Sequence, residues 1–530
     1  MSACENPNVD KDALMTRRQK FDGKTKICVK CKEIPGRIVI RYAVYCKSCF
    51  FPLIETRFRK SLEPSINVIP DGPRRKGLHA AGSLVIAFSG GIGSTALLDL
   101  VAKTYFAPRK EDLEKLKGGK EHPRNADKDV WKGRPAVCFV EVCGAFPGDR
   151  DRTEEIRAVV ESYPGSPFEF VPLRLEDAFD PDWWSAIGRG DLPSAARSLG
   201  LDMSDEDLKL SPSPVEYTPL DALRVYLQSL PTQTAFFSAI QTLTRVLLLH
   251  TSASRCASHL VLGTSLTSLS VNLISGIAQG SGYTVSEETK EEWNPRVIDG
   301  LPVRVVRPLR DIGMKECAIW DWWSRLPVVG RSRRYIEGGG KNAIGALTRD
   351  FIFGLESDYP ATVSTVARTC AKLTPKEGSD CTCVLCGRPV QHGVQEWKAQ
   401  ISIRAYEQAS TAVSGNTRPP HLTEEEIEKL IQVPHDTPHS SLSLTPRLCY
   451  ACHTTLTSRS SRGTATSIAK GKSVDDVPIP TWVRAAMYSF LPIHEIIAED
   501  NDDEETSLGR IKMTRTDMKA QIADFLLPDE

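Results

Sequence analysis

The stretch that decides the fold is Ser83–Thr95, SLVIAFSGGIGST. A run of apolar residues ends at a Ser-Gly-Gly loop, and a helix-forming segment, ALLDLVAKTYF, follows at once. This is the layout of a phosphate-binding loop, because the unpaired N–H groups at the start of a helix face the loop that precedes it. Ile92 and Gly93 occupy the middle of the loop, which therefore lacks the charges expected beside a phosphate. The stretch predicts a βα unit and leaves nucleotide binding open.

The same alternation continues along the chain. Four more short apolar segments are bounded by Gly, Pro or Ser, as buried parallel strands are, and they cover residues 136–142, 167–173, 259–265 and 303–309. Helical patterns lie between them at 152–163, 235–254 and 312–326. The alternation favours an α/β fold with a doubly wound parallel sheet. Two polar segments, 110–129 and 178–225, are expected to be peripheral insertions.

The bulk composition is that of an ordinary globular protein of two or three domains, with 530 residues, 41% of them hydrophobic and 25% charged. Basic and acidic side chains balance at 67 each, so a nucleic-acid surface would have to be a local patch. The start of the chain is polar, unlike a secretory signal, and no apolar run reaches the roughly 18 residues that span a bilayer. We therefore expect a soluble, cytoplasmic protein with no membrane partner. In that compartment the 15 cysteines favour metal sites over disulfides.

The first four candidate ligands form two CxxC pairs near the N-terminus. Cys28 and Cys31 form the first pair, and Cys46 and Cys49 follow after the short segment 32–45. Two such pairs can hold one ion in a Cys4 tetrahedron, and zinc is the usual occupant. A module of about 40 residues has too little core to fold alone, so a bound metal would supply folding energy. Four free cysteines with this spacing by chance are the less favoured alternative.

The second set consists of Cys383 and Cys386 with Cys449 and Cys452, and the long segment 387–448 lies between the two pairs. One site with so long an insertion is tolerable, because the entropic cost of loop closure grows slowly with length. Cys381 and His453 are alternative ligands, and two unrelated pairs are the alternative to one site. Four thiolates leave no open coordination position, so both predicted zinc sites are structural.

These features divide the chain into five predicted parts. They are an N-terminal cysteine module at 1–65, a basic linker at 66–79, the α/β domain at 80–355, a C-terminal cysteine region at 365–490 and an acidic, partly helical tail at 491–530. The C-terminal region contains a long Ser/Thr/Pro-rich insertion that is poor in core-forming residues.

Six stretches occur in order between residues 28 and 452: CVKCKEIPGRIVIRYAVYCKSCFFPLIETRFRKSL, SGGIGS, LGTSLTSLS, VRPLRDIGMKECAIW, CVLCG and LCYAC. Together they resemble the cytoplasmic tRNA 2-thiolation protein 2 family, the non-catalytic partner of the eukaryotic tRNA thiolase. The resemblance implies a degenerate PP-loop ATP pyrophosphatase fold, which is Rossmann-like. Active members of that superfamily adenylate a carbonyl oxygen and then replace AMP with a nucleophile. In tRNA thiolases the incoming atom is sulfur, and the implied donor is a thiocarboxylated ubiquitin-related modifier.

The sequence departs from the active members at the residues that perform this chemistry. Their loop is SGGxDS, and here Ser89, Gly90, Gly91 and Ser94 retain the part that could bind the phosphates of ATP. Gly93 replaces the Asp of that motif, and Ile92 replaces a Lys of the catalytic subunit. The segments that match the catalytic cysteines, 236–249 and 303–309, contain no cysteine. The resemblance therefore implies no catalytic residues, doubtful ATP binding and no iron–sulfur cluster on this chain.

Binding of tRNA is expected to begin with electrostatic contacts to phosphates. The preferred cations lie in and after the N-terminal module and in the linker: Arg41, Lys47, Arg57, Arg59, Lys60, Arg74, Arg75 and Lys76. Another basic cluster, Arg304, Arg307 and Arg310, flanks the fifth strand. Phe50 and Phe51 would add stacking surface for bases, unless they are core residues.

The leading hypothesis is a tRNA-binding subunit that forms a heterodimer with the catalytic thiolase and supports 2-thiolation of the wobble uridine in the tRNAs for Lys, Glu and Gln. One alternative is a self-sufficient ATP-dependent tRNA sulfurtransferase, which AMP formation by the isolated chain would favour. Another is a zinc-dependent scaffold for conjugation of the ubiquitin-related modifier, which a lack of tRNA affinity would favour.

Overall fold

The computed structural model describes residues 26–67, 78–106, 130–165, 167–203, 207–213, 215–290, 292–293, 302–330, 343–373, 381–391, 393–394, 398, 443–458 and 476–488. All of them lie within one compact unit, Met1–Ser489. The predicted tail, the linker residues Arg74, Arg75 and Lys76, and most of the Ser/Thr/Pro-rich insertion lie outside the described residues. The five predicted domain boundaries remain predictions.

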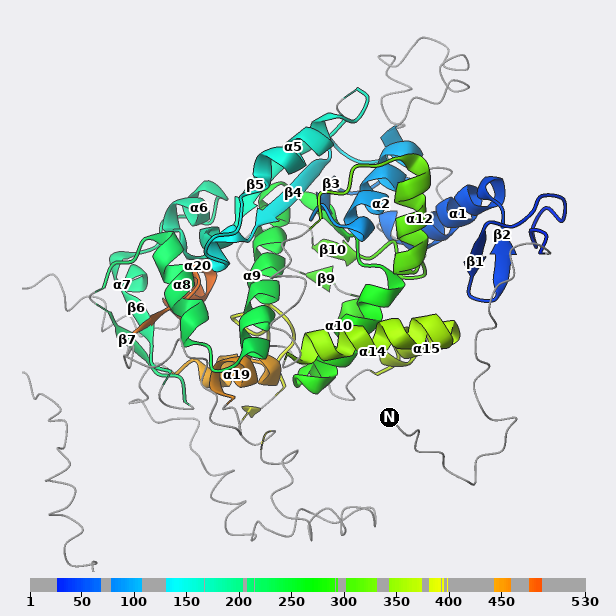
Figure 1. Ribbon diagram of the computed structural model, residues 1–530. Coiled ribbons are helices and arrows are strands. Elements are labelled where there is room, and N and C mark those ends of the chain that lie inside the picture. The colour runs from blue at the N-terminus through cyan, green and yellow to red at the C-terminus, as the bar shows by residue number, and fades with distance from the viewer. Residues whose placement is uncertain are drawn as a thin grey trace, which may run out of the picture. The chain divides into compact units, whose positions relative to one another are not determined.

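A six-stranded sheet with the order β5-β4-β3-β8-β10-β9 organises the described chain (Figure 1). Its parallel strands are β3 (Ser83–Ala87), β4 (Ala136–Glu141), β5 (Glu169–Arg174), β8 (Ala257–Leu262) and β10 (Val303–Val306), and the edge strand β9 (Glu292–Trp293) is antiparallel to β10. All five predicted strands are confirmed. Val85 of β3 pairs with Ala136 on one side and with Leu260 on the other. The strand order reverses at β3, so the loop that follows β3 lies at the topological switch point, where ligands of such sheets bind.

Helices cover both faces of the sheet, as predicted for a doubly wound fold. Successive strand residues point to opposite sides, so Leu84 and Ile86 pack on one face and Val85 on the other. The first face is covered by α1 (Lys47–Ile66), α2 (Ile92–Val101), α5 (Thr153–Glu161) and α12 (Met314–Ser324), and the second by α9 (Gln233–Ser254). α2 continues as a π-helical turn, η2 (Ala102–Phe106).

The segment 178–225, predicted to be a peripheral insertion, instead builds a second hydrophobic core. Leu201, Leu208 and Leu223 are fully buried, together with Val477 and Val483 from far along the chain. The first part of α9 joins this core, whose other elements are η3 (Cys143–Ala145), η4 (Leu175–Phe179), α6 (Pro181–Ala186), α7 (Ser194–Arg197), β6 (Leu199–Leu201), β7 (Leu210–Pro212), α8 (Pro219–Ser229), α19 (Tyr450–Thr457), β11 (Val477–Pro478) and α20 (Thr481–Tyr488), with residues on both sides of η7 (Thr445–Arg447). Strands β11, β6 and β7 form a small antiparallel sheet. The polar sequence concealed this core because its partners lie near the far end of the described chain.

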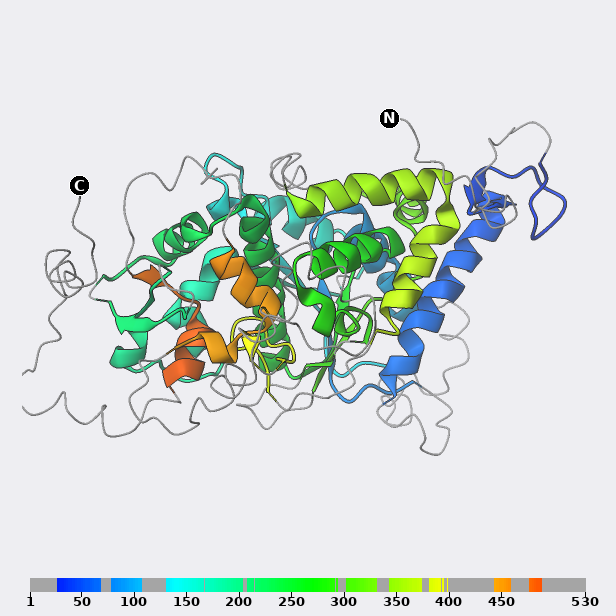
Figure 2. The ribbon, with the colours of Figure 1, turned by 90° about the horizontal axis from the view of Figure 1, so that it is seen from below.

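Two further groups of elements border the sheet. α10 (Leu266–Ala278) packs against α14 (Ile344–Asp358) and α15 (Pro360–Cys370), and η5 (Ser281–Thr284) and α11 (Glu287–Lys290) follow α10. At the other end of the described chain, a hairpin of β1 (Ile38–Ile40) and β2 (Ala43–Tyr45) precedes α1, which connects it to the sheet (Figure 2). None of the helices in the described ranges is long and apolar enough to cross a membrane.

Candidate phosphate loop, metal centres and nucleic-acid surface

The loop after β3, Ser89–Ser94, has the backbone of a phosphate-binding loop. Gly90 has a φ of +73°, in the left-handed region that glycine tolerates, and Gly91 is the N-cap of α2. The polar groups of the loop bond to one another. Ser94 Oγ donates to Gly91 O at 2.9 Å and accepts from Ser89 N at 3.3 Å, and the hydroxyls of Ser89 and Ser94 are 3.2 Å apart. The predicted loop residues are therefore brought together, but their side chains already have partners.

The position of the missing Asp is closed by backbone. A Cβ on Gly93 would lie 2.2 Å from Gly263 O, in the loop after β8, and a Cβ on Gly263 would lie 2.5 Å from Ser94 Cα. Non-bonded heavy atoms do not approach so closely, so the two glycines allow the loops of β3 and β8 to touch. A side chain at position 93 would require the β8 loop to move.

A second segment, which ends at Gly330 in the described chain, also contacts this loop. Gly330 N donates to Gly90 O at 3.1 Å, and a Cβ on Gly90 would lie 2.5 Å from Ile156 Cδ1. Arg152 Nη1 holds this segment by donating to Gly330 O at 2.5 Å. The buried carboxylate of Glu141, at the end of β4, accepts from Arg152 N at 2.8 Å. Gly90 and Arg152 therefore hold Gly330 against the loop, and Glu141 holds Arg152 in turn. The sequence motif did not predict these contacts.

The four N-terminal cysteines converge as predicted and are here called the N-terminal quartet. Their Sγ atoms lie within 4.8 Å of one another, and Cys31 and Cys46 Sγ are 3.8 Å apart. A tetrahedron with metal–sulfur bonds of about 2.3 Å has edges of about 3.8 Å, so the geometry fits a metal ion. Burial opposes ionisation of Cys28, but backbone hydrogen bonds from Cys31, Cys46 and Lys30 outweigh it and lower the pKa of this thiol to about 6.

Cys383, Cys386, Cys449 and Cys452, the C-terminal quartet, also converge, although the whole segment 387–448 separates the two pairs. Their Sγ atoms lie within 4.8 Å of one another, and Cys386 and Cys449 Sγ are 3.7 Å apart. The arrangement supports one site rather than two unrelated pairs. The proposed substitutes, Cys381 and His453, are not members of this group; Cys381 is exposed, and buried His453 lies 3.4 Å from Thr457 Oγ1 through its Nδ1.

Both quartets use the same local structure. In each first pair, the residue after the second cysteine is left-handed and its N–H donates to the carbonyl of the first cysteine: Lys32 to Cys28 at 2.8 Å and Gly387 to Cys383 at 2.7 Å. In each second pair, the first cysteine is the N-cap of a helix, Cys46 of α1 and Cys449 of α19. A helix N-terminus favours negative charge, which suits thiolate ligands.

An ionic cluster attaches the C-terminal quartet to the sheet. Glu288 accepts from Arg307 at 2.6 Å and from Arg388, which lies two residues after Cys386. Arg245 of α9 donates to Cys386 O at 2.6 Å. Burial opposes the ionisation of Glu288, but the three arginine charges outweigh it and lower its pKa to about 2. Arg307, predicted to flank an RNA surface, is thus a buried structural residue.

Of the other predicted RNA-binding residues, some bond to the protein itself and some are exposed to solvent. Arg57 binds Glu316 at 3.1 Å, Arg59 binds Glu63 at 3.1 Å, and Arg304 donates to Ser65 O at 2.8 Å. Phe50 is fully buried, so it is a core residue rather than a stacking surface. Lys47 and Lys60 are exposed, and Arg310 is exposed beside β10.

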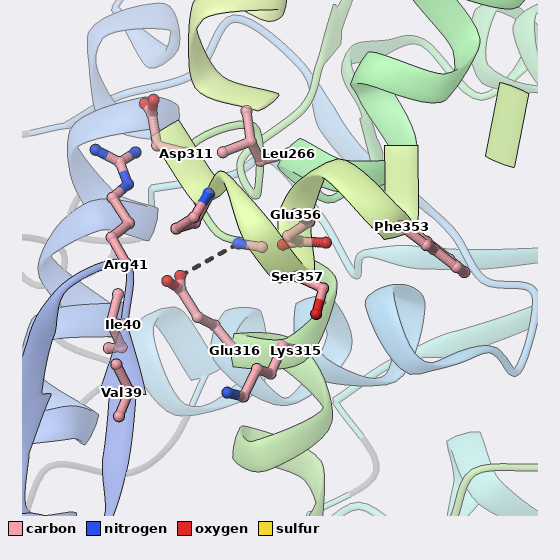
Figure 3. Close-up of a pocket in the computed structure, with 12 residues that line it drawn as sticks. Val39, Ile40, Arg41, Leu266, Asp311, Lys315, Glu316, Phe353, Glu356 and Ser357 are labelled. Carbon is pink, nitrogen blue, oxygen red and sulfur yellow. Dashed lines mark hydrogen bonds between the residues drawn. The ribbon is translucent and has the colours of Figure 1, made fainter. Parts of the chain in front are cut away.

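Arg41 lines a pocket of about 310 Å³ between the β1–β2 hairpin, the start of α12 and the end of α14 (Figure 3). The pocket carries two cations, Arg41 and Lys315, and three carboxylates, of which Glu316 accepts from Gly313 N at 3.2 Å and Glu356 from Thr267 Oγ1 at 2.9 Å. Burial raises the pKa of both glutamates. Charges of both signs line the pocket and the glutamates are bonded to the protein, so the pocket alone does not define a ligand.

Among the described residues, the cysteines outside the two quartets do not gather into a third cluster. Cys138 and Cys317 are buried, and burial raises the pKa of both thiols, that of Cys138 to about 12. Cys143 is half-buried. Cys256 is exposed in a left-handed turn.

Comparisons with known proteins agree with these features. A model of the family "Cytoplasmic tRNA 2-thiolation protein 2" matches residues 343–454, which contain the whole C-terminal quartet. The protein of that name from Danio rerio is 27% identical over 410 residues, covering 71% of this chain and 75% of that protein. The Homo sapiens protein is 26% identical over 402 residues, covering 68% and 71%.

Among solved structures, the U34-tRNA thiolase NcsA from Methanococcus maripaludis with its 4Fe-4S cluster aligns with a TM-score of 0.40 and 16% identity, over 66% of this chain and 88% of that chain. The family match and the relatives confirm the resemblance carried by the sequence motifs. The chain is therefore similar to the cytoplasmic tRNA 2-thiolation protein 2 family, through a family model at residues 343–454 and through relatives of about 27% identity over most of its length.

Proposed function

We propose that this chain is a non-catalytic, tRNA-binding subunit of a cytoplasmic complex that 2-thiolates the wobble uridine of tRNA. The names of its relatives support the pathway and the compartment. The observation that carries the non-catalytic role is the contact between Gly93 and Gly263, which fills the place of the missing carboxylate. Adenylation requires groups that stabilise the charge developing on phosphate, and the loop offers no charged side chain for it.

The subunit would act through its surface and its partner rather than through its loop. The partner would be the catalytic tRNA thiolase, in a heterodimer, and the sulfur would come from a thiocarboxylated ubiquitin-related modifier. The tRNAs would be those for Lys, Glu and Gln. The N-terminal module supports RNA binding, because residues 26–49 carry six basic side chains and one acidic side chain.

Zinc is the proposed occupant of both quartets. Closed Cys4 sites with tetrahedral edges near 3.8 Å suit zinc in a structural role. In the N-terminal module the ion would fix the hairpin and the start of α1. In the C-terminal region the ion would join the pair Cys383 and Cys386 to α19.

The test is mass spectrometry of 2-thiouridine in tRNA from cells that lack the protein, complemented with wild type or with Ser94→Ala. We expect 2-thiouridine to disappear in the deletion and to return with both forms, because Ser94 only braces the loop. Unchanged 2-thiouridine in the deletion would contradict the proposed pathway. A second assay follows AMP release from ATP by the purified chain with tRNA, where turnover without the partner would identify a thiolase in its own right.

A further inference from the structure

One large aromatic side chain of α12 stays mostly exposed beside aromatic residues that pack on the start of α1. Trp322, in the last turn of α12, leaves 73% of its surface exposed, the largest value among the exposed large hydrophobic side chains of the described residues. Tryptophan is enriched at binding surfaces, so a tryptophan this exposed is a candidate contact residue if its surroundings suit a ligand.

The neighbours of Trp322 hold its ring in place. It is stacked on the half-buried Trp323, with ring centroids 6.3 Å apart and an angle of 29° between the planes. Trp323 packs edge-on against the buried Phe50 of α1 at 5.1 Å. Trp323 is therefore anchored in the core through Phe50. The exposed ring of Trp322 leaves room for another planar group to stack.

A lysine lies next to these aromatic rings. Lys47 Nζ lies 5.9 Å from the centroid of Trp323 and 6.0 Å from that of Phe51. Lys47 directly follows Cys46 of the N-terminal quartet, so the aromatic residues lie next to the basic N-terminal module. Arg325, also exposed, ends α12 three residues after Trp322. A planar aromatic surface next to cations is the arrangement that holds unpaired nucleotides, which need a stacking partner for the base and a cation for the phosphate.

We propose that Trp322 is a stacking platform for an unpaired base of tRNA and that Lys47 binds a phosphate of the same single-stranded segment. This inference rests on the proposed function and names the residues that contact its RNA. A protein partner on the same surface is less suited to it, because partner interfaces favour apolar centres depleted of lysine. The contact consists of base stacking and charge attraction, so it selects unpaired over paired RNA. It does not select a particular base, because every base can stack.

The experiment measures the affinity of the full-length, metal-loaded chain for a labelled anticodon stem-loop RNA and for the fully paired duplex of its stem. Trp322→Ala should weaken stem-loop binding by a factor of about 5 to 160, the range for removal of one stacked base, and leave duplex binding unchanged. Trp322→Phe should retain most of the affinity. Phe351→Ala, which removes another exposed aromatic side chain (58% exposed, on α14), is the control and should change neither affinity.

Salt titrations separate the two roles. Lys47→Gln should lower the slope of log K against log salt by about 0.7 to 0.9, the value of one phosphate contact, whereas Trp322→Ala should leave the slope unchanged. Equal stem-loop affinity for wild type and Trp322→Ala would overturn the inference while the proposed function stands. Dissociation of the thiolase partner from Trp322→Ala with tRNA affinity intact would also overturn it, in favour of a protein interface. No affinity of the wild type for tRNA, with 2-thiouridine unaffected in deletion cells, would remove the proposed function itself.

Discussion

At the scale of single residues, position 93 determines whether the β3 loop could regain the carboxylate of the active motif. Gly93 lies against the backbone of Gly263 rather than against a side chain that could turn aside. Overpacking a close contact typically costs about 1–3 kcal/mol, and backbone cannot relieve it by changing rotamer.

We predict that Gly93→Asp lowers the free energy of unfolding by about 2 kcal/mol or more and does not produce AMP-forming activity. Urea denaturation and an AMP release assay measure the two effects. The control is Gly91→Ala, because a Cβ there would meet only Ser89 Oγ, at 3.6 Å, and the φ of −81° suits alanine. A fully stable Gly93→Asp protein would show that the β8 loop moves freely.

Asp321 of α12 has a buried carboxyl group, and the ionisation of this group lowers the stability of the folded protein as the pH rises. Its side chain is 3% exposed, and neither carboxyl oxygen has a hydrogen-bond partner in the described part of the chain. Burial and the nearby charge of Asp99 raise its pKa to about 8. In the unfolded chain the group ionises near pH 4, so between about pH 4 and pH 8 folding takes up a proton and stability falls with rising pH.

Asp321→Asn removes this titration. Relative to wild type, the variant should become more stable as the pH is raised from 5 to 8, by at most about 1.4 kcal/mol per pH unit. Urea midpoints at both pH values measure the change. The exposed Asp350 supplies the control, Asp350→Asn, which should show the same difference from wild type at both pH values.

Single residues were predictable where they belong to a local motif. The four CxxC pairs of the two quartets and the glycines of the β3 loop follow from spacing, because each pair or turn is built within a few residues. Gly263, Gly330 and Arg152 were not predictable as the groups that close the loop, since they act through contacts between distant loops. Trp322 and Trp323 stand in the sequence as WDWW, but composition does not show which of them the fold leaves exposed.

At the scale of elements, the C-terminal quartet depends on the rest of the fold more than the N-terminal quartet does. Arg388 and Arg245 connect its first pair to Glu288 and to α9, and Trp482 of α20 donates to Leu385 O at 3.1 Å. A cluster of buried charges is costly when one member is removed, typically by about 3–5 kcal/mol, because the others are left without compensation.

We predict that Glu288→Gln destabilises the protein by about 3 kcal/mol and accelerates release of one of two bound zinc ions to a chelating dye. Metal analysis should find two zinc ions per chain for wild type and one for Cys28→Ser/Cys31→Ser, whose remaining ion reports on the C-terminal quartet. Glu287→Gln, with the same charge change next door, is the control. Equal release rates for Glu288→Gln and wild type would show that the ionic cluster does not support the metal site.

Whether a strand could be predicted from the sequence depends on its length and on how far along the chain its partner lies. The five parallel strands have apolar runs that mark buried strands of a doubly wound sheet. The strands of the small sheet, LGL, LSP and VP, are too short for a pattern, and β6 pairs with β11, where Leu201 lies opposite Val477 from the other half of the chain. The similar local structure of the two quartets was likewise visible only once the backbone was known.

At the scale of the whole molecule, the balance of 67 basic and 67 acidic side chains means that attraction of a polyanion has to be local. The N-terminal module concentrates that attraction, with Lys26, Lys30, Lys32 and Arg37 all exposed around the N-terminal quartet. Screening acts over about 8 Å at physiological ionic strength, so cations elsewhere on the chain do not compensate for those of the module.

We therefore predict that Lys30→Gln/Arg37→Gln weakens tRNA binding and lowers the slope of log K against log salt by about 0.7 to 0.9 for each phosphate that is no longer neutralised. The matched control, Arg150→Gln/Arg197→Gln, makes the same charge change at exposed positions outside the module and should leave affinity and slope unchanged. Zinc content has to stay at the wild-type value in both variants, because Lys30 lies next to Cys31. If the two double variants weaken binding equally, binding depends on total charge, and the module is not the site where tRNA first docks.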